Sequence, residues 1–194
     1  MILTKGNKGK DLYKEWNGET YARYPIQTKT IMPHDDLMGV MHGYLDENIE
    51  AGDIIGIAES MISVTQKRAY KFSEIKYGYW AKLLSRFVKR TPAGIGLGTP
   101  QTMQLAINEV GLLRILCAAG FSAITKPFGV AGLFYRIAGA RARGIDGPTE
   151  NTLPPYNEYA SLLPKNPNKI LQKLDSAFKE KEVSFCIVDA NDIG

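Results

Sequence analysis

The chain has 194 residues and a formal net charge of +4, with 44% hydrophobic and 23% charged residues. This length and composition fit one globular domain, or one domain with an appendage. The mild charge leaves room for an anionic substrate, but it is not the concentrated basic stripe that indicates a nucleic-acid partner.

Targeting and membrane signals are absent from the sequence. Residues 1–8 lack an apolar core, so we expect no signal peptide. The longest apolar stretch, 115–124, is too short to span a membrane. Cys117 and Cys186 lie in apolar runs, which predicts buried, reduced thiols. We therefore expect a soluble, cytoplasmic protein without a membrane partner.

The first third of the chain contains three predicted elements after a polar start. Residues 1–24 are predicted to form an N-terminal arm that packs on the body or on a partner. The pattern of 26–32 predicts a strand. Asp35 or Asp36 can then cap a helix with apolar residues from Leu37 to Leu45. The apolar run 54–58 predicts a strand buried on both faces.

The remainder alternates predicted helices with a final strand. Apolar residues recur at helical spacing over 79–88, and Thr99-Pro100 and Asn166-Pro167 are typical helix starts. The apolar run 183–189 predicts another strand. We predict an α/β (mixed α+β) fold in which 54–58 and 183–189 are central strands of one mixed sheet. The helices beginning at Thr99 and Asn166 should cover that sheet or the layer beside it.

Two aspartates stand where structure-forming segments end. Asp146 lies in the turn 144–147, and Asp189 ends the apolar run 183–189. A carboxylate at the mouth of a buried strand is a usual ligand of a hard metal ion or a phosphate-bearing group. Either aspartate alone could simply cap a turn. Together they favour a metal–nucleotide site in which both converge on one pocket.

Two glycine-containing segments offer further candidate sites. The loop 94–100 could expose backbone N–H groups to phosphate at a helix N-terminus, although tight packing is the favoured use of its glycines. It matches neither the dinucleotide nor the Walker spacing. Arg136, Arg141 and Arg143 are interleaved with glycines, which suits carboxylate or phosphate recognition or, equally, a solvated basic face.

An ordered set of landmarks, rather than any single motif, resembles a known family. These are Asp35-Asp36-Leu37, the run 52–63, Gly144-Ile145-Asp146, the run 162–167 and Ile187-Val188-Asp189. The set resembles the coenzyme F-420-0:L-glutamate ligase (gamma-glutamyl ligase) family. The resemblance implies a family domain at 25–194, after the arm at 1–24, with the C-terminal part of the family absent.

The resemblance also implies a reaction and a set of site residues. The family joins the amine of L-glutamate to the carboxylate of a deazaflavin coenzyme precursor, using GTP, Mg²⁺ or Mn²⁺ and an acyl phosphate intermediate. It implies that Asp146 and Asp189 are metal ligands. It implies that nucleotide is contacted by Thr30, Ile31, Glu59, Ser60 and Thr149.

Several positions depart from the family pattern. Val64 replaces a lysine, Ala190 a threonine, His34 a glycine and Thr149 an asparagine, although Asn151 lies close by. The chain also stops at Gly194, where the family supplies another acidic ligand. These departures keep open an alternative, a non-catalytic module that binds nucleotide or an anionic metabolite. A nucleic-acid binder is disfavoured. Completion of the site by a second copy predicts a homodimer.

Overall fold

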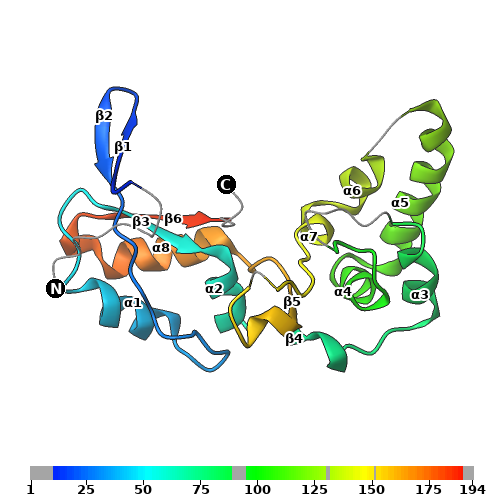
Figure 1. Ribbon diagram of the computed structural model, residues 1–194, viewed down its shortest axis with the longest axis horizontal. Coiled ribbons are helices and arrows are strands. Elements are labelled where there is room, and N and C mark those ends of the chain that lie inside the picture. Colours follow the sequence, from blue (N-terminus) through cyan, green and yellow to red (C-terminus); the bar gives the residue numbers. More distant parts are fainter. Residues whose placement is uncertain (1–10, 89–94, 130–131, 151, 190–194) are drawn as a thin grey trace. The chain divides into compact units, whose positions relative to one another are not determined.

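The computed structural model describes residues 11–88, 95–129, 132–150 and 152–189 (Figure 1). The chain forms two compact units. The first unit contains Met1–Met61 and Asn166–Gly194, and the second unit contains Ile62–Lys165. Helices and strands are mixed in sequence, which confirms the mixed α+β class. The described strands form three two-stranded sheets rather than one central sheet.

The first unit is built on two parallel strands that are distant in sequence. Strand β3 (Ile54–Ala58) pairs with β6 (Ser184–Val188), so that Ile54 lies opposite Ser184 and Ala58 opposite Val188. Helix α8 (Pro167–Ala177) and a 3-10 turn, Lys179–Lys181, precede β6, and α8 packs against it. The predicted pairing of these two apolar runs in one sheet is confirmed.

The expectation that these strands are buried on both faces is wrong. Ile57 and Phe185 are buried, whereas Ile54 is 67% exposed. Residues of a strand alternate between faces, so covering one face buries only every second side chain. Phe178, which follows α8, packs against both α1 and β6 in this small core. Its ring centroid lies 4.5 Å from that of His42, on which it stacks, and 5.3 Å from that of Phe185.

Helix α1 (Leu37–Leu45) forms as predicted and buries Val40, Met41 and Leu45. Of the two candidate caps, Asp36 is the N-cap and accepts a hydrogen bond from the Gly39 N–H at 2.8 Å. The strand predicted at 26–32 does not form. Backbone N–H groups of this segment donate to the Tyr44 hydroxyl and the Asp35 carboxylate instead of to a neighbouring strand.

The described part of the predicted arm is a hairpin. Strands β1 (Tyr13–Trp16) and β2 (Glu19–Ala22) are antiparallel, and every residue in them is exposed. Asn17 and Gly18 both have positive φ (50° and 81°), as the two-residue turn that matches strand twist requires. Residues 1–10 of the arm lie outside the described residues.

The second unit is mainly helical. Helix α2 (Glu59–Thr65) begins in the first unit and ends in the second. The other helices are α3 (Tyr79–Ser85), α4 (Pro100–Val110), α5 (Leu112–Thr125), α6 (Leu133–Ala138) and α7 (Ala140–Arg143). Strands β4 (Ala69–Lys71) and β5 (Tyr159–Ser161) are antiparallel, and 3-10 turns cover Phe72–Glu74, Lys126–Phe128 and Tyr156–Glu158.

The main hydrophobic core lies in the second unit, where α4 is its centre. Met103, Leu105 and Ala106 of α4 pack with buried residues of α3, α5 and α7. The helix starts at Thr99-Pro100 as predicted and builds the core of the second unit, whereas β3 and β6 belong to the first. Whether it covers their sheet or the layer beside it stays a prediction. The prediction of buried cysteines is wrong. Cys117 is exposed, because it lies on the outer face of α5, and Cys186 is half-buried. Both thiols are free, as expected.

Candidate functional site

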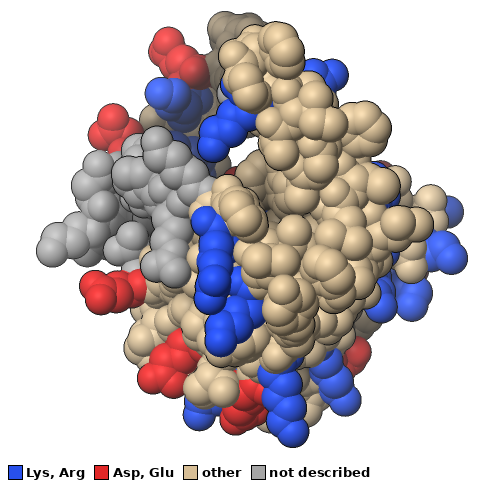
Figure 2. Space-filling model, turned by 90° about the vertical axis from the view of Figure 1, so that its right-hand side faces the viewer, with Lys and Arg blue, Asp and Glu red and all other residues tan. Residues whose placement is uncertain are grey.

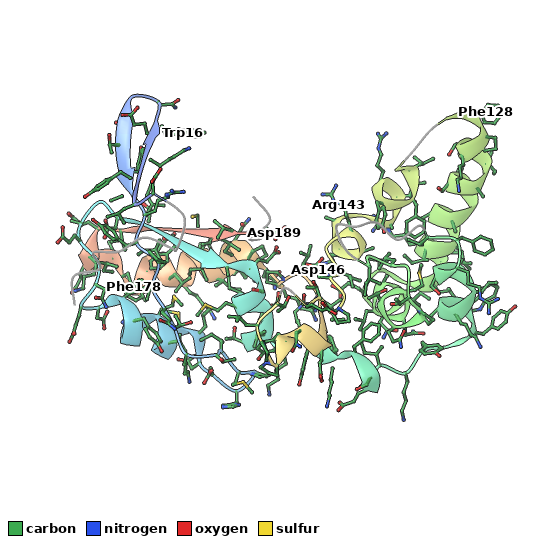
Figure 3. The ribbon with its side chains drawn as sticks, viewed as in Figure 1. Trp16, Phe128, Arg143, Asp146, Phe178 and Asp189 are labelled. Carbon is green, nitrogen blue, oxygen red and sulfur yellow. The ribbon has the colours of Figure 1, made fainter. Side chains whose placement is uncertain are left out.

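The carboxyl ends of β3 and β6 bring three of the predicted site residues to one edge of a sheet. Because these strands are parallel and Ala58 lies opposite Val188, the residues that follow them leave the sheet at the same edge. Those residues are Glu59 and Ser60 after β3, and Asp189, which Figure 3 labels, after β6. Glu59 is half-buried, whereas Ser60 and Asp189 are exposed. Two carboxylates and a hydroxyl therefore share this edge.

The predicted nucleotide contacts Thr30 and Ile31 lie in a loop closed by Asp35. One Asp35 oxygen accepts a hydrogen bond from Lys29 Nζ at 2.6 Å, and the other accepts one from the Met32 N–H at 2.7 Å. Thr30 is exposed, but Ile31 is only 8% exposed. The side chain of Ile31 thus belongs to the core, and the nucleotide role of Thr30 and Ile31 stays a prediction.

The charge of Asp35 is stabilised by the same loop. Its hydrogen bond with the Lys29 ammonium, and secondly that with the Met32 N–H, lower the pKa of the Asp35 carboxyl. The backbone N–H of Lys29 in turn donates to the Tyr44 hydroxyl at 2.8 Å, which ties the loop to α1. A shallow hollow of about 570 Å³ lies here, lined by residues that include Lys29, Asp35, Gly39 and Tyr44. Sequence reasoning identified Asp35 as a possible cap and as part of the landmark Asp35-Asp36-Leu37, but it did not connect Lys29 or Tyr44 with this loop.

The turn that carries Asp146 is held by backbone hydrogen bonds. The Asp146 N–H donates to the Ser161 carbonyl at 3.0 Å, and the Ser161 N–H donates to the Asp146 carbonyl at 2.9 Å. The residue itself is exposed. Gly144 permits close packing here, because a Cβ on it would overlap the Leu163 side chain. A carboxylate on a firmly held turn fits a binding role as well as a structural one.

A buried ion pair holds the strand to which this turn is hydrogen-bonded. Arg68 donates through Nε to the Leu163 carbonyl at 2.6 Å and through Nη2 to Glu109 at 2.9 Å. Both side chains of this pair are less than 10% exposed. The Arg68 carbonyl also accepts from the Leu162 N–H, so the ion pair fixes the strand to which Asp146 is bonded. Sequence reasoning missed Arg68, since no local motif marks it.

Thr149 follows this turn and is exposed. Its carbonyl accepts a hydrogen bond from the Thr152 N–H at 3.2 Å. Asn151, the nearby amide of the family pattern, lies outside the described residues. Thr149 and Asp146 thus belong to one short segment of the second unit, and the nucleotide role of Thr149 stays a prediction.

The glycine loop before α4 is used for packing. Thr99 caps the helix by accepting from the Thr102 N–H at 3.3 Å, and Leu97, Thr99 and Thr102 are all buried. This arrangement favours the packing alternative over a phosphate site; Gly94 lies outside the described residues. Of the arginines, Arg141 lies 3.4 Å from Glu109 and so has a structural partner, and Arg136 and Arg143 are exposed.

Within the described residues, no group of three or more His, Cys, Asp or Glu side chains could hold a metal ion. Glu59 and Asp189, which follow the two paired strands, carry hard oxygen ligands of the kind that Mg²⁺ and Mn²⁺ prefer. They fit such an ion as a partial set. Asp146 belongs to the second unit and Asp189 to the first. Their convergence stays a prediction.

The departures from the family pattern can be placed only in part. Val64 is 6% exposed, so this position in α2 is occupied by a packed apolar side chain. His34 is exposed in the loop before α1. Ala190 and Gly194 lie outside the described residues.

No single helix in the described parts of the chain is long and apolar enough to cross a membrane. The helix pair Pro100–Val110 and Leu112–Phe128 passes by length and composition, but it is bent by 115°. The α4 half of this pair contributes to the hydrophobic core, as do Ile115 and Ala118 of α5.

Comparison with known proteins supports the resemblance seen in the landmarks. A search of curated proteins gave no match. The sequence model of the F420-0:gamma-glutamyl ligase family matches residues 25–192, which is most of the chain. Residues 25–192 include every predicted site residue, whereas the hairpin of β1 and β2 precedes the match. The chain therefore belongs to the F420-0:gamma-glutamyl ligase family, a family of ligases.

Proposed function

We propose that this protein is a nucleotide- and metal-dependent amide ligase that attaches L-glutamate to a carboxylate, with a coenzyme F-420 precursor as the acceptor. In the first step a carboxylate oxygen attacks the γ-phosphorus of GTP, which forms an acyl phosphate and releases GDP. In the second step the glutamate amine attacks the acyl carbon, phosphate leaves, and the amine loses a proton. One amide bond is formed for each GTP consumed.

The observation that carries this proposal is the shared edge at the ends of β3 and β6. Glu59 and Asp189 place two carboxylates there, next to the Ser60 hydroxyl. In α/β proteins, ligands are commonly bound at the carboxyl ends of parallel strands. Asp189 and Asp146 would hold Mg²⁺ or Mn²⁺, which when bound would neutralise charge on the transferring phosphate. Thr30, Ile31, Glu59, Ser60 and Thr149 would bind the nucleotide.

The replacement of the family's lysine by Val64 lowers the nucleotide affinity and the turnover rate that we expect. A lysine–phosphate contact is worth about 1.5–3 kcal/mol, so its absence should weaken nucleotide affinity by roughly ten- to a hundred-fold. We therefore expect weak nucleotide binding and slow turnover. We further propose that the active species is a cytoplasmic homodimer.

A non-catalytic binding module is the second candidate. The buried Val64 favours it, since a packed apolar side chain replaces the phosphate-pairing cation. Such a module should keep its ligand affinity when Asp146 and Asp189 lose their charge, whereas a metal-dependent ligase should not.

The test combines Mn²⁺ binding, GTP binding and product formation on the full chain. Asp189→Asn and Asp146→Asn should each weaken Mn²⁺ binding at least ten-fold and remove the glutamate-dependent amide product detected by mass spectrometry. Asp175→Asn, an exposed carboxylate in α8, is the control and should change neither. GTP bound with unchanged affinity by Asp146→Asn and Asp189→Asn, without any product from the parent chain, would favour the binding module.

A further inference from the structure

The exposed aromatic side chains of the first unit are gathered in the segment 13–24, which contains the hairpin of β1 and β2. The family match begins at residue 25, so this segment is an addition to the matched domain. The exposed aromatic side chains of the unit are Tyr13, Trp16, Tyr21 and Tyr24. Its other Phe, Tyr and Trp side chains are half-buried or buried, namely Tyr44, Phe178 and Phe185.

Two of these rings share one face of the hairpin. The register pairs Trp16 with Glu19 and Lys14 with Tyr21. Directly opposed residues lie on the same face, and so do alternate residues along a strand. Trp16 and Tyr21 are therefore diagonal neighbours on one face. Tyr13 precedes Lys14 and projects from the opposite face.

The space between these two rings fits one flat aromatic ring. Diagonal neighbours across an antiparallel pair are about 7–8 Å apart, which equals two stacking contacts of about 3.5–4.0 Å between carbon atoms. In the described parts of the chain, neither ring stacks on another aromatic side chain. The Tyr21 hydroxyl donates to Glu19 at 2.6 Å, which limits the rotation of its ring. Lys14 places a cation beside the gap, which suits a ring with an anionic group attached.

We propose that Trp16 and Tyr21 bind the flat ring of the acceptor between them, so that the hairpin is the element that recognises this substrate. The inference rests on the proposed function, because its ligand is the deazaflavin ring of the coenzyme precursor. The two side chains contact the ring and not the carboxylate that reacts. Stacking therefore stabilises the bound substrate and the transition state equally, which lowers the KM for the acceptor without changing kcat.

The second unit also has exposed aromatic side chains, but they are less suited to this role. Figure 2, which views the side on which α5 lies in Figure 1, shows Lys and Arg beside a broad uncharged area. Two exposed aromatic residues of this unit, Tyr79 and Trp80, contact each other edge to face with ring centroids 5.5 Å apart, which leaves no gap for a third ring. The hairpin, on which Figure 3 labels Trp16, belongs to the unit that contains Glu59 and Asp189. The ring and the carboxylate of the acceptor would thus both meet residues of one compact unit.

Trp16 emission tests the proposal directly. Trp16 is the single tryptophan of the full chain with Trp80→Phe, and the probe is 5-deazariboflavin, which has the ring but neither phosphate nor carboxylate. We expect saturable quenching of Trp16 by the probe. Tyr21→Ala should weaken the affinity for the probe at least five-fold, because stacking on one aromatic side chain contributes roughly five- to a hundred-fold.

Two matched variants control this titration. Tyr21→Phe keeps the ring and loses only the hydroxyl, so the affinity for the probe should stay within three-fold. Tyr13→Ala removes a ring that is 61% exposed on the opposite face of the same hairpin, and it should change the affinity less than two-fold. A loss of affinity in Tyr13→Ala equal to that in Tyr21→Ala would show that the variants disturb the hairpin as a whole, and would overturn the assigned face.

Steady-state kinetics separate this inference from the proposed function. In Trp16→Ala and Tyr21→Ala the KM for the acceptor should rise at least five-fold, while kcat and the KM for GTP stay unchanged. Amide formation with an unchanged acceptor KM in both variants would overturn the inference and leave the proposed function standing. Tyr21-dependent quenching by the probe in a chain that forms no amide would leave the ring site standing and overturn the ligase.

Two further results would overturn the ring site itself. Quenching of Trp16 by guanosine as strong as that by the probe would assign the gap to the base of the nucleotide. Trp16 emission that resists quenching by acrylamide in the ligand-free chain would show that this face of the hairpin is already covered.

Discussion

The two units of the chain differ in both packing and charge. The second unit contains the main hydrophobic core, a buried Arg68–Glu109 ion pair and a glycine in close contact with a leucine. The first unit has a two-stranded sheet with Ile54 exposed, a fully exposed hairpin and an open hollow beside α1. The second unit contains 14 Lys and Arg and 5 Asp and Glu, which gives a net charge of +9. The first unit contains 10 Lys and Arg and 15 Asp and Glu, which gives a net charge of −5.

This difference suggests separate contributions to a ligase. Most of the predicted ligand contacts, Thr30, Ile31, Glu59, Ser60 and Asp189, belong to the open, acidic unit, which suits a cation with its nucleotide. The basic unit suits anionic groups, and its backbone hydrogen bonds with Ser161 hold the Asp146 turn. Binding residues on less regular segments supported by a rigid scaffold are a common arrangement.

The largest expected effect comes from breaking the buried ion pair. Arg68→Met would leave Glu109 with only Arg141, which is more distant and whose side chain is 53% exposed. Loss of one partner from a buried pair costs about 3 kcal/mol or more. Urea unfolding in a Trp16→Phe background measures it, because Trp80 of α3 then reports on the second unit alone.

Arg141→Met is the matched control and should cost less than about 1 kcal/mol, as expected for an exposed pair. Hydrogen exchange of the β3 and β6 amides shows whether the first unit is affected. Equal loss of protection there would mean that the two units unfold together, and the contrast in stability between them would be lost.

A smaller effect is expected at the Asp146 turn. Gly144→Ala would place a Cβ against Leu163, and such overpacking costs about 1–3 kcal/mol. Leu163→Ala should make room, so the double variant should recover at least 1 kcal/mol relative to the sum of the two single changes. The same urea experiment measures this coupling. Gly43→Ala, in open space on α1, is the control and should not destabilise the chain. If the free-energy changes of the variants at 144 and 163 simply add, the two residues are not in close contact.

Local patterns predicted much of this fold. The strand at 54–58 was predicted with its observed bounds, and the helices after Asp36, Thr99 and Asn166 were predicted at their starts. In each case a few adjacent residues determine the element. Even so, Asn166 acts through a left-handed backbone (φ 50°) and makes no side-chain cap.

Features that depend on distant contacts were not predicted. The strand expected at 26–32 had a suitable pattern but has no partner strand, because side chains of α1 and the preceding loop take its hydrogen bonds. The burial of β3 depends on which faces are covered, and an apolar run does not encode that. In the candidate site, the parallel pairing of β3 and β6 explains why Glu59 and Asp189 follow strands that end at the same edge. The contacts by which Arg68 supports the Asp146 turn join residues about 40 and 95 positions apart, and no local pattern marks them.

The smallest predicted effect is a pH dependence confined to the first unit. The Lys29 hydrogen bond lowers the pKa of Asp35, so folding depresses this carboxyl below the ordinary aspartate value of about 3.9. A depressed folded pKa adds stability above the unfolded value and loses it as the pH falls through the folded value. The loop 29–36 should therefore open only in acid. Carboxyl carbon NMR measures the pKa directly. Lys29→Met should raise it, since the hydrogen bond that lowers the pKa most is removed. Lys169→Met in α8 removes the same charge elsewhere and should leave it unchanged. An Asp35 carboxyl with the same pKa in both variants would show that Lys29 does not hold this loop, and the hollow beside it would then lack a fixed wall.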